Sequence, residues 1–233
     1  MPRQSYFITG TDTDSGKTVV TAGLLRLAAR NGLSTRAMKP LASGCEQTSE
    51  GLRNADALAL SQAMTESMPY ESVNPVAMEP AIAPHVAARD VGRRVSAERL
   101  AGFCRGAMMR PADLFLVEGA GGWRVPLNDH ETWRDLVSDL QLPVILVVGL
   151  RLGAINHALL SAELIQHDGC RLAGWVANRC TPEPMAREDE TFETLCEYMP
   201  APCMGRIPWL GSRDPAAMAE EASRHLSLPL PGA

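Results

Sequence analysis

The segment from Gly10 to Thr18 combines glycines, a lysine and hydroxyl side chains in an order that can hold phosphate groups. Glycines let the backbone approach phosphate oxygens closely, and successive N–H groups at the start of a helix attract anions. Lys17 can neutralise the β and γ phosphates of a nucleotide, and the Thr18 hydroxyl can ligate Mg²⁺. We therefore predict that this segment binds a nucleoside triphosphate together with Mg²⁺.

The spacing of this segment differs from that of the common phosphate loop. Five residues separate Gly10 from Gly16, one more than in G-x-x-x-x-G-K-[ST], and Thr11 stands where the first glycine is expected. A plain turn followed by a helix N-cap is the alternative interpretation. The phosphate loop is favoured because a strand is expected over residues 6–8 and a helix over 17–31, and the loop connects such elements.

Two classes of nucleotide-binding protein are disfavoured by single positions. Switch ATPases of the ParA and MinD type carry a second lysine five positions before the loop lysine, where this chain has Asp12. GTPases read guanine with an N-K-x-D sequence, and the nearest match, at residues 178–181, lacks both the lysine and the aspartate. Asn178 could still pair with an adenine edge, because an amide both donates and accepts hydrogen bonds.

Acidic and basic side chains follow other expected strands. Glu118 ends the apolar run 114–117. Mg²⁺ prefers carboxylate and phosphate oxygens as ligands, and active groups collect at the carboxyl ends of parallel strands. The alternative for Glu118 is a solvated residue at a tight turn. Asp56 could be a second Mg²⁺ ligand, but a helix-start acid favoured by the helix dipole explains it about equally well. Lys39 follows the strand expected over 36–38, and its alternative is a solvated surface lysine.

Short apolar runs alternate with helical patterns, which is typical of strands buried on both faces and of parallel sheets. We predict a single P-loop NTPase-like α/β domain over residues 1–226, with a mostly parallel sheet flanked by helices on both faces. A loose tail is expected over 227–233, and 66–95 is interpreted as an irregular excursion near the site. Arg93 and Arg94 are either part of a lid or simply exposed. The expected strands are 6–8, 36–38, 114–117, 144–148 and 173–177, and the expected helices are 17–31, 54–64, 96–109, 155–167 and 186–198.

Charge and composition argue against several partners. The net charge is −5 and the isoelectric point about 5.6, whereas nucleic acid and anionic membranes attract clustered positive charge. The longest apolar run, 142–150, is shorter than the roughly 20 residues that span a bilayer, and the first six residues do not resemble a signal peptide. The six cysteines form no C-x-x-C pair, which suits reduced thiols. We expect a cytoplasmic protein that binds neither nucleic acid nor membrane.

Taken together, these residues resemble the dethiobiotin synthetase family, and the resemblance runs through nearly the whole chain. Seven ordered blocks carry it, which is far more specific than one loop, and the family's longer loop also accounts for the unusual spacing. The blocks are residues 10–18 (GTDTDSGKT), 39–44 (KPLASG), 51–57 (GLRNADA), 117–122 (VEGAGG), 152–157 (LGAINH), 174–178 (GWVAN) and 205–209 (GRIPW).

The resemblance implies a cyclo-ligase that forms C–N bonds. In the family's reaction, 7,8-diaminopelargonate (7,8-diaminononanoate) and CO₂ give dethiobiotin, with release of ADP and phosphate. One amine is carbamylated, and the carbamate attacks the γ-phosphate of ATP to give a carbamic–phosphoric anhydride. The second amine then closes the ring and expels phosphate. The resemblance further implies Mg²⁺ as cofactor, ATP as co-substrate, and a homodimer with the substrate site at its interface.

The resemblance also assigns roles to individual residues. It implies that Lys17 and Lys39 are catalytic and stabilise the carbamate and the transferring phosphoryl group. Metal binding is implied for Thr18, Asp56 and Glu118. Substrate binding is implied for Thr13, Ser43, Gly153, Ala154 and Asn156, the last three at a helix start that receives the substrate carboxylate across the interface. Nucleotide binding is implied for Asp14, Ser15, Gly16, Lys17, Thr18, Val19, Asp56, Glu118, Gly119, Ala120, Gly121, Asn178, Arg179, Ile207, Pro208 and Trp209.

Three other functions are compatible with the loop. A cobyrinate-type amidotransferase relative shares the loop style but normally needs a glutaminase domain, for which 233 residues leave no room. A nucleotide-switched, partner-binding ATPase is disfavoured by Asp12. A small-molecule kinase is possible from the loop alone. Residues 181–200 lie outside the matching blocks, so contacts with the substrate tail are not assigned.

Overall fold

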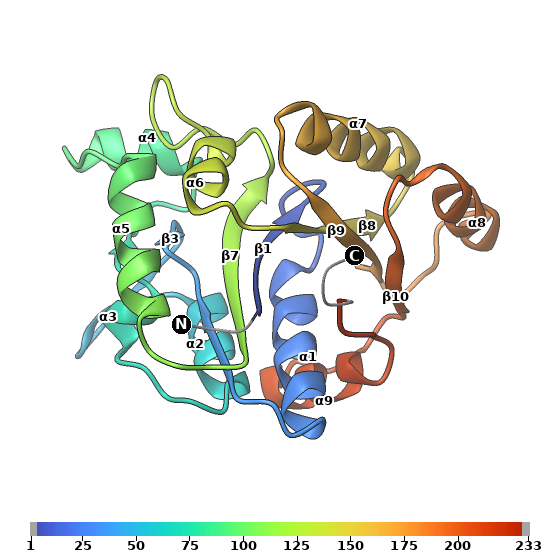
Figure 1. Ribbon diagram of the computed structural model, residues 1–233, viewed down its shortest axis with the longest axis horizontal. Helices are drawn as coiled ribbons and strands as arrows, with labels where there is room; N and C mark the ends of the chain where they lie inside the picture. The colour runs from blue at the N-terminus through green and yellow to red at the C-terminus, as the bar shows by residue number, and fades with distance from the viewer. Residues whose placement is uncertain (1–3, 230–233) are drawn as a thin grey trace.

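A six-stranded parallel sheet forms the centre of the protein, seen in a computed structural model that describes residues 4–229 (Figure 1). Its strand order is β10-β9-β8-β1-β7-β2, so β1, which leads into the phosphate loop, lies in the interior of the sheet. The strands of this sheet are β1 (Gln4–Gly10), β2 (Thr35–Met38), β7 (Leu114–Gly122), β8 (Val144–Leu150), β9 (Leu172–Arg179) and β10 (Cys203–Ile207).

Helices cover both faces of the sheet, and two small two-stranded sheets lie beside it. The parallel pair is β3 (Leu41–Ala42) with β6 (Val76–Ala77), and the antiparallel pair is β4 (Glu46–Thr48) with β5 (Gly51–Arg53). The helices are α1 (Lys17–Arg30), α2 (Ala55–Ala63), α3 (Tyr70–Val73), α4 (Pro84–Asp90), α5 (Ala97–Met108), α6 (Trp133–Leu140), α7 (Ala154–His167), α8 (Glu188–Tyr198) and α9 (Pro215–Ser223).

Neighbouring residues of each central strand belong to two different hydrophobic clusters, one on each face of the sheet. Phe7 packs into the cluster built with α5, α6, α7 and α8, whereas Ile8 packs into the cluster built with α1, α2 and α9. Val144 and Ile145 of β8 divide in the same way. Side chains alternate across a strand, so a strand covered on both faces must be apolar at every position. This confirms the predicted parallel sheet with helices on both faces.

Several elements differ from the sequence prediction. The structure adds β10, α6 and α9, none of which was predicted. α6 begins with a capping box, in which Thr132 and Asp135 each satisfy a backbone N–H of the other residue. α9 begins at Pro215 after Asp214, whose carboxylate accepts two backbone N–H bonds. The helix predicted over 186–198 begins at Glu188 instead, because Arg187 is in the left-handed conformation (φ 57°).

Two segments predicted as irregular contain ordered structure. Residues 66–95 include α3, β6 and α4, so this excursion is more regular than expected. Of the tail predicted as loose, Ser227 donates a backbone N–H to the Met204 carbonyl at 2.7 Å, and Leu228 packs against the core. Residues 230–233 lie outside the described part of the chain. Within residues 4–229, no helix is both long and apolar enough to cross a membrane.

Replacing Gly23 in α1 by valine should destabilise the fold. A Cβ atom at Gly23 would lie 2.9 Å from both Ala222 Cβ and Leu226 Cδ1, closer than van der Waals contact allows. We expect Gly23→Val to lower the free energy of unfolding by about 1–3 kcal/mol, measured by urea denaturation. The matched control is Gly102→Val in α5, where an added Cβ meets open space. Equal effects of the two substitutions would contradict the tight α1–α9 contact.

Candidate active site

The phosphate loop between β1 and α1 depends on two glycines for different reasons. Gly16 precedes the first residue of α1 in the left-handed conformation (φ 87°), and a Cβ there would lie 2.0 Å from Asn178 Nδ2. A Cβ on Gly10 would lie 2.2 Å from Ser15 Oγ and 2.9 Å from the Asp12 carbonyl oxygen. The backbone therefore folds back on itself at a distance that only glycine allows.

The interior of this loop presents polar groups suited to an anion. Ser15 Oγ is buried and has no hydrogen-bond partner among the described residues. Lys17 is buried as well, and within residues 4–229 its Nζ donates one hydrogen bond, to the Asp12 carbonyl at 3.1 Å. A buried hydroxyl without a partner costs free energy. An oxyanion in the loop could bind this hydroxyl and the ammonium together, so the residues present fit a nucleotide phosphate.

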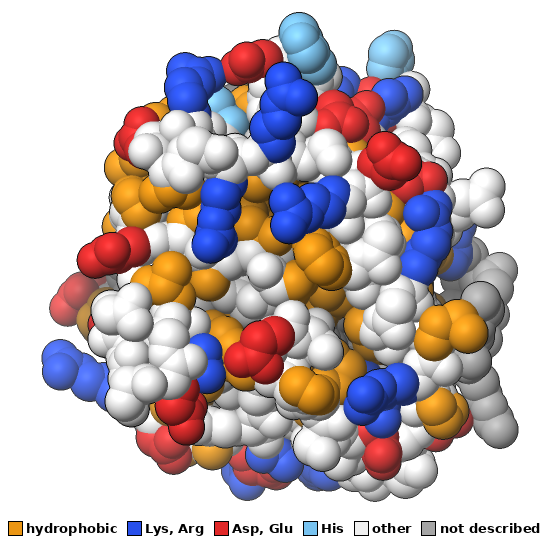
Figure 2. All heavy atoms as spheres, turned by 90° about the vertical axis from the view of Figure 1, so that its left-hand side faces the viewer, with side chains coloured by type: hydrophobic (Ala, Val, Ile, Leu, Met, Phe, Trp, Pro, Cys, Tyr) orange, Lys and Arg blue, Asp and Glu red, His pale blue; other side chains and the backbone are white. Residues whose placement is uncertain are grey.

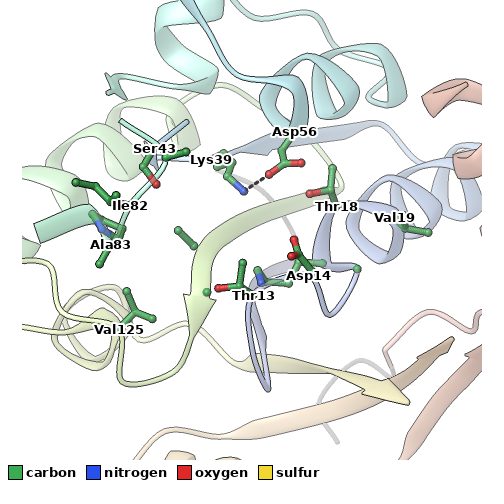
Figure 3. Close-up of a pocket in the computed structure, with 16 residues that line it drawn as sticks. Thr13, Asp14, Thr18, Val19, Lys39, Ser43, Asp56, Ile82, Ala83 and Val125 are labelled. Carbon is green, nitrogen blue, oxygen red and sulfur yellow. Dashed lines mark hydrogen bonds and ion pairs between the residues drawn. The ribbon is translucent and has the colours of Figure 1, made fainter. Parts of the chain in front are cut away.

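Three charged side chains from separate segments meet beside the loop (Figure 3). Lys39 Nζ lies 2.7 Å from Asp56 Oδ2 and 2.8 Å from Glu118 Oε1. Lys39 follows β2, Asp56 lies in the first turn of α2, and Glu118 lies within β7. The strand β7 continues to Gly122, so Glu118 is inside the strand and does not end it as predicted. The three predicted residues are thus brought together, with Lys39 between two carboxylates.

Glu118 is fully buried, and threonines of α1 complete its hydrogen bonds. Thr18 Oγ1 donates to Glu118 Oε1 at 2.8 Å, and Thr21 Oγ1 donates to Glu118 Oε2 at 2.7 Å. A buried carboxylate is tolerated when it is paired and hydrogen-bonded. Thr21 was not predicted, although its position one helical turn after Lys17 could have indicated it. Glu118 therefore ties α1, β7 and the segment after β2 into one cluster.

Burial and neighbouring charges shift the pKa values of this cluster. Burial lowers the pKa of Lys17, and the Glu118 carboxylate offsets only part of that effect. For Lys39, burial also acts to lower the pKa, but the Glu118 and Asp56 carboxylates outweigh it and the pKa rises. Burial acts to raise the pKa of Asp56, and the Lys39 ammonium outweighs it, so this pKa is lowered. Lys39 is therefore a permanent cation at neutral pH, while Lys17 is the more easily perturbed ammonium.

A cavity of about 640 Å³ opens in front of the cluster. Figure 3 shows Thr13, Thr18, Lys39 and Asp56 on one side of this space, with Ile82, Ala83 and Val125 on the other. The apolar wall was not predicted, because residues 81–84 and Val125 belong to none of the motifs. The lining residues are Thr13, Asp14, Gly16, Lys17, Thr18, Val19, Lys39, Ser43, Asp56, Ala81, Ile82, Ala83, Pro84, Ala120, Gly121 and Val125.

A second cavity, of about 230 Å³, lies on the other side of the α1 start and shares Asp14, Gly16 and Val19 with the first. Asn178, Arg179 and Trp209 line it, as do Cys180, Leu210, Gly211, Ser212 and Met218. Among the predicted nucleotide-binding residues, Ile207 has its side chain in the core and Pro208 is exposed. Neither lines this cavity.

Two predicted nucleotide-binding side chains of this second cavity are engaged by protein groups. Asn178 Nδ2 donates to the Ser15 carbonyl at 3.0 Å, which links the end of β9 to the phosphate loop. The Arg179 guanidinium forms a two-pronged bond with Glu188, with Nη2 at 2.7 Å and Nε at 3.0 Å from Oε1. Arg206 of β10 reaches the same oxygen at 2.8 Å. These bonds hold Asn178 and Arg179 in place in the wall of the second cavity.

The remaining predicted residues lie around the first cavity or outside it. Ala120 and Gly121 line it, whereas Gly119 faces the core, where an added Cβ would lie 2.7 Å from Phe7 Cζ. Gly153, Ala154 and Asn156 form the start of α7, outside both cavities. The preceding Arg151 forms an ion pair with Asp12, which holds this helix start next to the phosphate loop.

The oxygen ligands at the cluster suit Mg²⁺ bound with a nucleotide. Residues 4–229 contain no group of three or more His, Cys, Asp and Glu side chains that could hold a metal ion. Thr18, Asp56 and Glu118 nevertheless place one hydroxyl and two carboxylates around Lys39, the partial oxygen set that Mg²⁺ usually takes from a protein. Phosphate oxygens and waters would then complete the octahedron.

The chain is similar to proteins of known name and structure. A family profile described as an AAA domain matches residues 4–217. The chain is 55% identical over 228 residues to the ATP-dependent dethiobiotin synthetase BioD of Marinobacter nauticus, covering 98% of this chain and 97% of that protein. It is 58% identical over 215 residues to the protein of that name from Pseudomonas aeruginosa, covering 92% and 94%. A ParA family ATPase from Chlorobium tepidum TLS shares the fold, with a TM-score of 0.55 at 15% identity over 96% of this chain and 90% of that one.

Removing the Glu188 charge should destabilise the protein in a pH-dependent way. Burial acts to raise the pKa of Glu188, but its bonds to Arg179 and Arg206 outweigh burial and lower it. A lowered pKa gives stability that is present above the unfolded-state pKa and is lost as pH falls through the folded-state value. We expect Glu188→Gln to cost about 1–3 kcal/mol at pH 7, and less below about pH 4, by urea denaturation.

The control is Glu190→Gln, which removes a half-exposed carboxylate of α8 that pairs with Arg187, the residue before this helix. Exposed pairs contribute little, so this variant should change stability by less than about 1 kcal/mol at either pH. If Glu188→Gln cost the same at pH 7 and pH 3, the charged network around Arg179 would not be stabilising.

Proposed function

We propose that this chain, which belongs to the dethiobiotin synthetase family, catalyses the ATP-dependent carboxylation and ring closure of 7,8-diaminopelargonate to dethiobiotin. The observation that carries the proposal is the buried Lys39 ammonium, held between Asp56 and Glu118 in the wall of the cavity that also contains the phosphate loop. A permanent cation beside a triphosphate site suits the transfer of a phosphoryl group to an anionic acceptor.

Each step of the proposed reaction places negative charge near Lys17 and Lys39. A substrate amine adds to CO₂ and loses a proton, which gives a carbamate. A carbamate oxygen forms a bond to the γ-phosphorus while the bond from phosphorus to the ADP oxygen breaks. The second amine then bonds to the carbamoyl carbon, the C–O bond to phosphate breaks, and a proton leaves the amine. The two ammonium groups neutralise the carbamate and the phosphoryl oxygens throughout.

Lys39 acts in this proposal as an electrostatic group and not as a proton acceptor. Its raised pKa follows from the two carboxylates beside it, so it keeps its proton at neutral pH. A general base needs a pKa near the working pH, which Lys39 does not have. Mg²⁺, held by Thr18, Asp56 and Glu118, would neutralise phosphate charge. Thr13 and Ser43 line the same cavity and are suited to orient the diamine by hydrogen bonds.

The apolar wall of the cavity favours this substrate over a small polar acceptor. Ile82 and Val125 face the charged wall across the cavity, as Figure 3 shows. The diamine of the proposed substrate sits on an aliphatic chain, which can lie against these side chains while the amines face Lys39. The adenine of ATP would occupy the smaller cavity, where Trp209 offers an aromatic face and Asn178 an amide.

We further propose a homodimer in which the start of α7 from one protomer closes the substrate site of its partner. Leu152, just before α7, is 93% exposed, and Leu160 within α7 is 56% exposed, so this surface carries apolar groups without cover in one protomer. The backbone N–H groups at Gly153 and Asn156 could receive the substrate carboxylate, because helix starts attract anions. The Ala154 N–H instead donates to the Arg151 carbonyl at 2.9 Å. Leu160→Asp should shift the protein to monomer in light-scattering measurements, and unchanged mass would contradict the interface.

The deciding experiment is a direct product assay. The protein is incubated with Mg²⁺, ATP, bicarbonate and 7,8-diaminopelargonate, and dethiobiotin is measured by mass together with ADP and phosphate. We expect equal amounts of the three products. Phosphate release without the cyclic product would overturn the ligase proposal, and phosphorylated diamine would point to a kinase.

Lys39→Ala tests the role of the central cation. We expect kcat to fall at least about 100-fold, because stabilisation of transferring charge is lost, while binding of a fluorescent ATP analogue persists. The same change leaves Glu118 buried with hydroxyl partners only, so we also expect a lower melting temperature. Thermal unfolding is therefore measured first, and kinetics are recorded well below the melting temperature. Near-normal turnover would remove Lys39 from the mechanism.

A further inference from the structure

A third cavity, of about 570 Å³, is lined by three arginines and two histidines that the proposed reaction does not use. It shares no lining residue with the phosphate-loop cavity, and α4 stands between them, with Pro84 in the first wall and His85 in the other. The elements around it are α4, the start of α5 and the loop 126–132. The lining residues are His85, Ala88, Arg89, Arg93, Arg94, Val95, Ser96, Leu127, Asn128, Asp129, His130 and Glu131.

We propose that this cavity binds a small dianion, a phosphate or a dicarboxylate, through Arg93 and Arg94. Neither guanidinium has a carboxylate within ion-pair distance among residues 4–229, whereas Arg89 is paired with Asp129 at 2.8 Å. Arg93 donates one hydrogen bond to the Ala77 carbonyl at 3.2 Å and keeps its other donors. A guanidinium presents parallel N–H groups that match two oxygens of a phosphate or a carboxylate.

The two acidic residues of the cavity compensate its three arginines only in part. The Asp129 carboxylate is taken by Arg89. Glu131 Oε2 accepts the Ala97 backbone N–H at 3.1 Å and a second bond from the Asn128 amide. The neutral donors bonded to Glu131 do not cancel its charge. Three arginines against two carboxylates therefore leave the cavity one net positive charge, with its histidines neutral. Figure 2 shows basic and histidine side chains gathered toward the top of this face, with acidic ones between them.

The walls of the cavity are held in place without a ligand. Asn128 Nδ2 donates to the Val95 carbonyl at 2.9 Å, and its Oδ1 accepts the backbone N–H groups of His130 and Glu131. Gly92, in the left-handed conformation (φ 62°), ends α4 and lets the Arg93 N–H return to the Ala88 carbonyl at 2.8 Å. The arginines are therefore presented by a fixed turn, which lowers the entropic cost of binding.

His85 lies in the wall of this cavity and, within residues 4–229, has one ring nitrogen without a protein partner. Its Nδ1 atom is buried and has no hydrogen-bond partner among the described residues. Buried polar atoms are nearly always hydrogen-bonded in proteins. Because His85 directly follows Pro84 of the first cavity, a ligand in this cavity would lie behind the wall of the proposed substrate site.

The test measures anion binding with the phosphate loop already filled. The protein is saturated with Mg²⁺ and a non-hydrolysable ATP analogue, so that added anions do not enter the loop, and is titrated calorimetrically with inorganic phosphate or, separately, with succinate. The variant is Arg93→Gln with Arg94→Gln. The matched control, Arg110→Gln with Arg171→Gln, removes the same charge from two exposed arginines outside the cavity.

We expect saturable uptake of one anion per chain, weakened at least about tenfold by the Arg93/Arg94 changes and unaffected by the control. Binding of phosphate alone would assign the phosphate class, and binding of succinate alone the dicarboxylate class. The proposal is overturned if neither anion binds up to roughly 10 mM, or if both double variants weaken binding equally. None of these outcomes depends on turnover, so the ligase proposal stands or falls separately.

Discussion

The fully buried Glu118 carboxylate is the constraint on which the rest of the site depends. A charge without exposure is stable only when opposite charge and hydrogen bonds surround it. Here the partners come from Lys39 after β2 and from Thr18 and Thr21 in α1. The first turns of α1 must therefore sit directly over β7, and the β2 end must turn inward. The geometry of the phosphate loop follows from satisfying one acid in the middle of the sheet.

The same constraint explains which parts of the fold could be read from the sequence. Strands such as Val144–Leu150 are apolar at every position because helices cover both faces, and that pattern is visible in a single chain. The strand Cys203–Ile207 lies at the edge of the sheet and is partly exposed. It includes Gly205 and Arg206, so its sequence shows no continuous apolar run. The signals for α6 and α9, a capping box and an Asp-Pro start, were present in the sequence but precede short helices.

The site itself was only partly predictable, because its members are distant in sequence. The loop Gly10–Thr18 is contiguous, and its residue types predict phosphate binding directly. Asp56 had no special status by spacing, and only the resemblance to a family joined it to Glu118. The apolar wall at Ile82 and Val125 carries no motif, since an apolar residue facing a cavity looks like one facing the core. Asn178, in contrast, was predicted, but the structure gives its amide a second role. The amide supports the loop backbone at Ser15 as well as lining the smaller cavity.

Lys17 and Lys39 are the only lysines in the chain, against twenty arginines. Both are buried in the active site, so the outer surface takes all of its positive side-chain charge from guanidinium groups and histidines. Reagents that acylate or alkylate lysine find none on that surface and must enter the reaction cavity, which Lys17 and Lys39 line. Coupling the protein to a support or a dye through lysine therefore competes with occupancy by nucleotide. Acetylation of Lys39 would remove both the central cation of the site and the charged partner of Glu118.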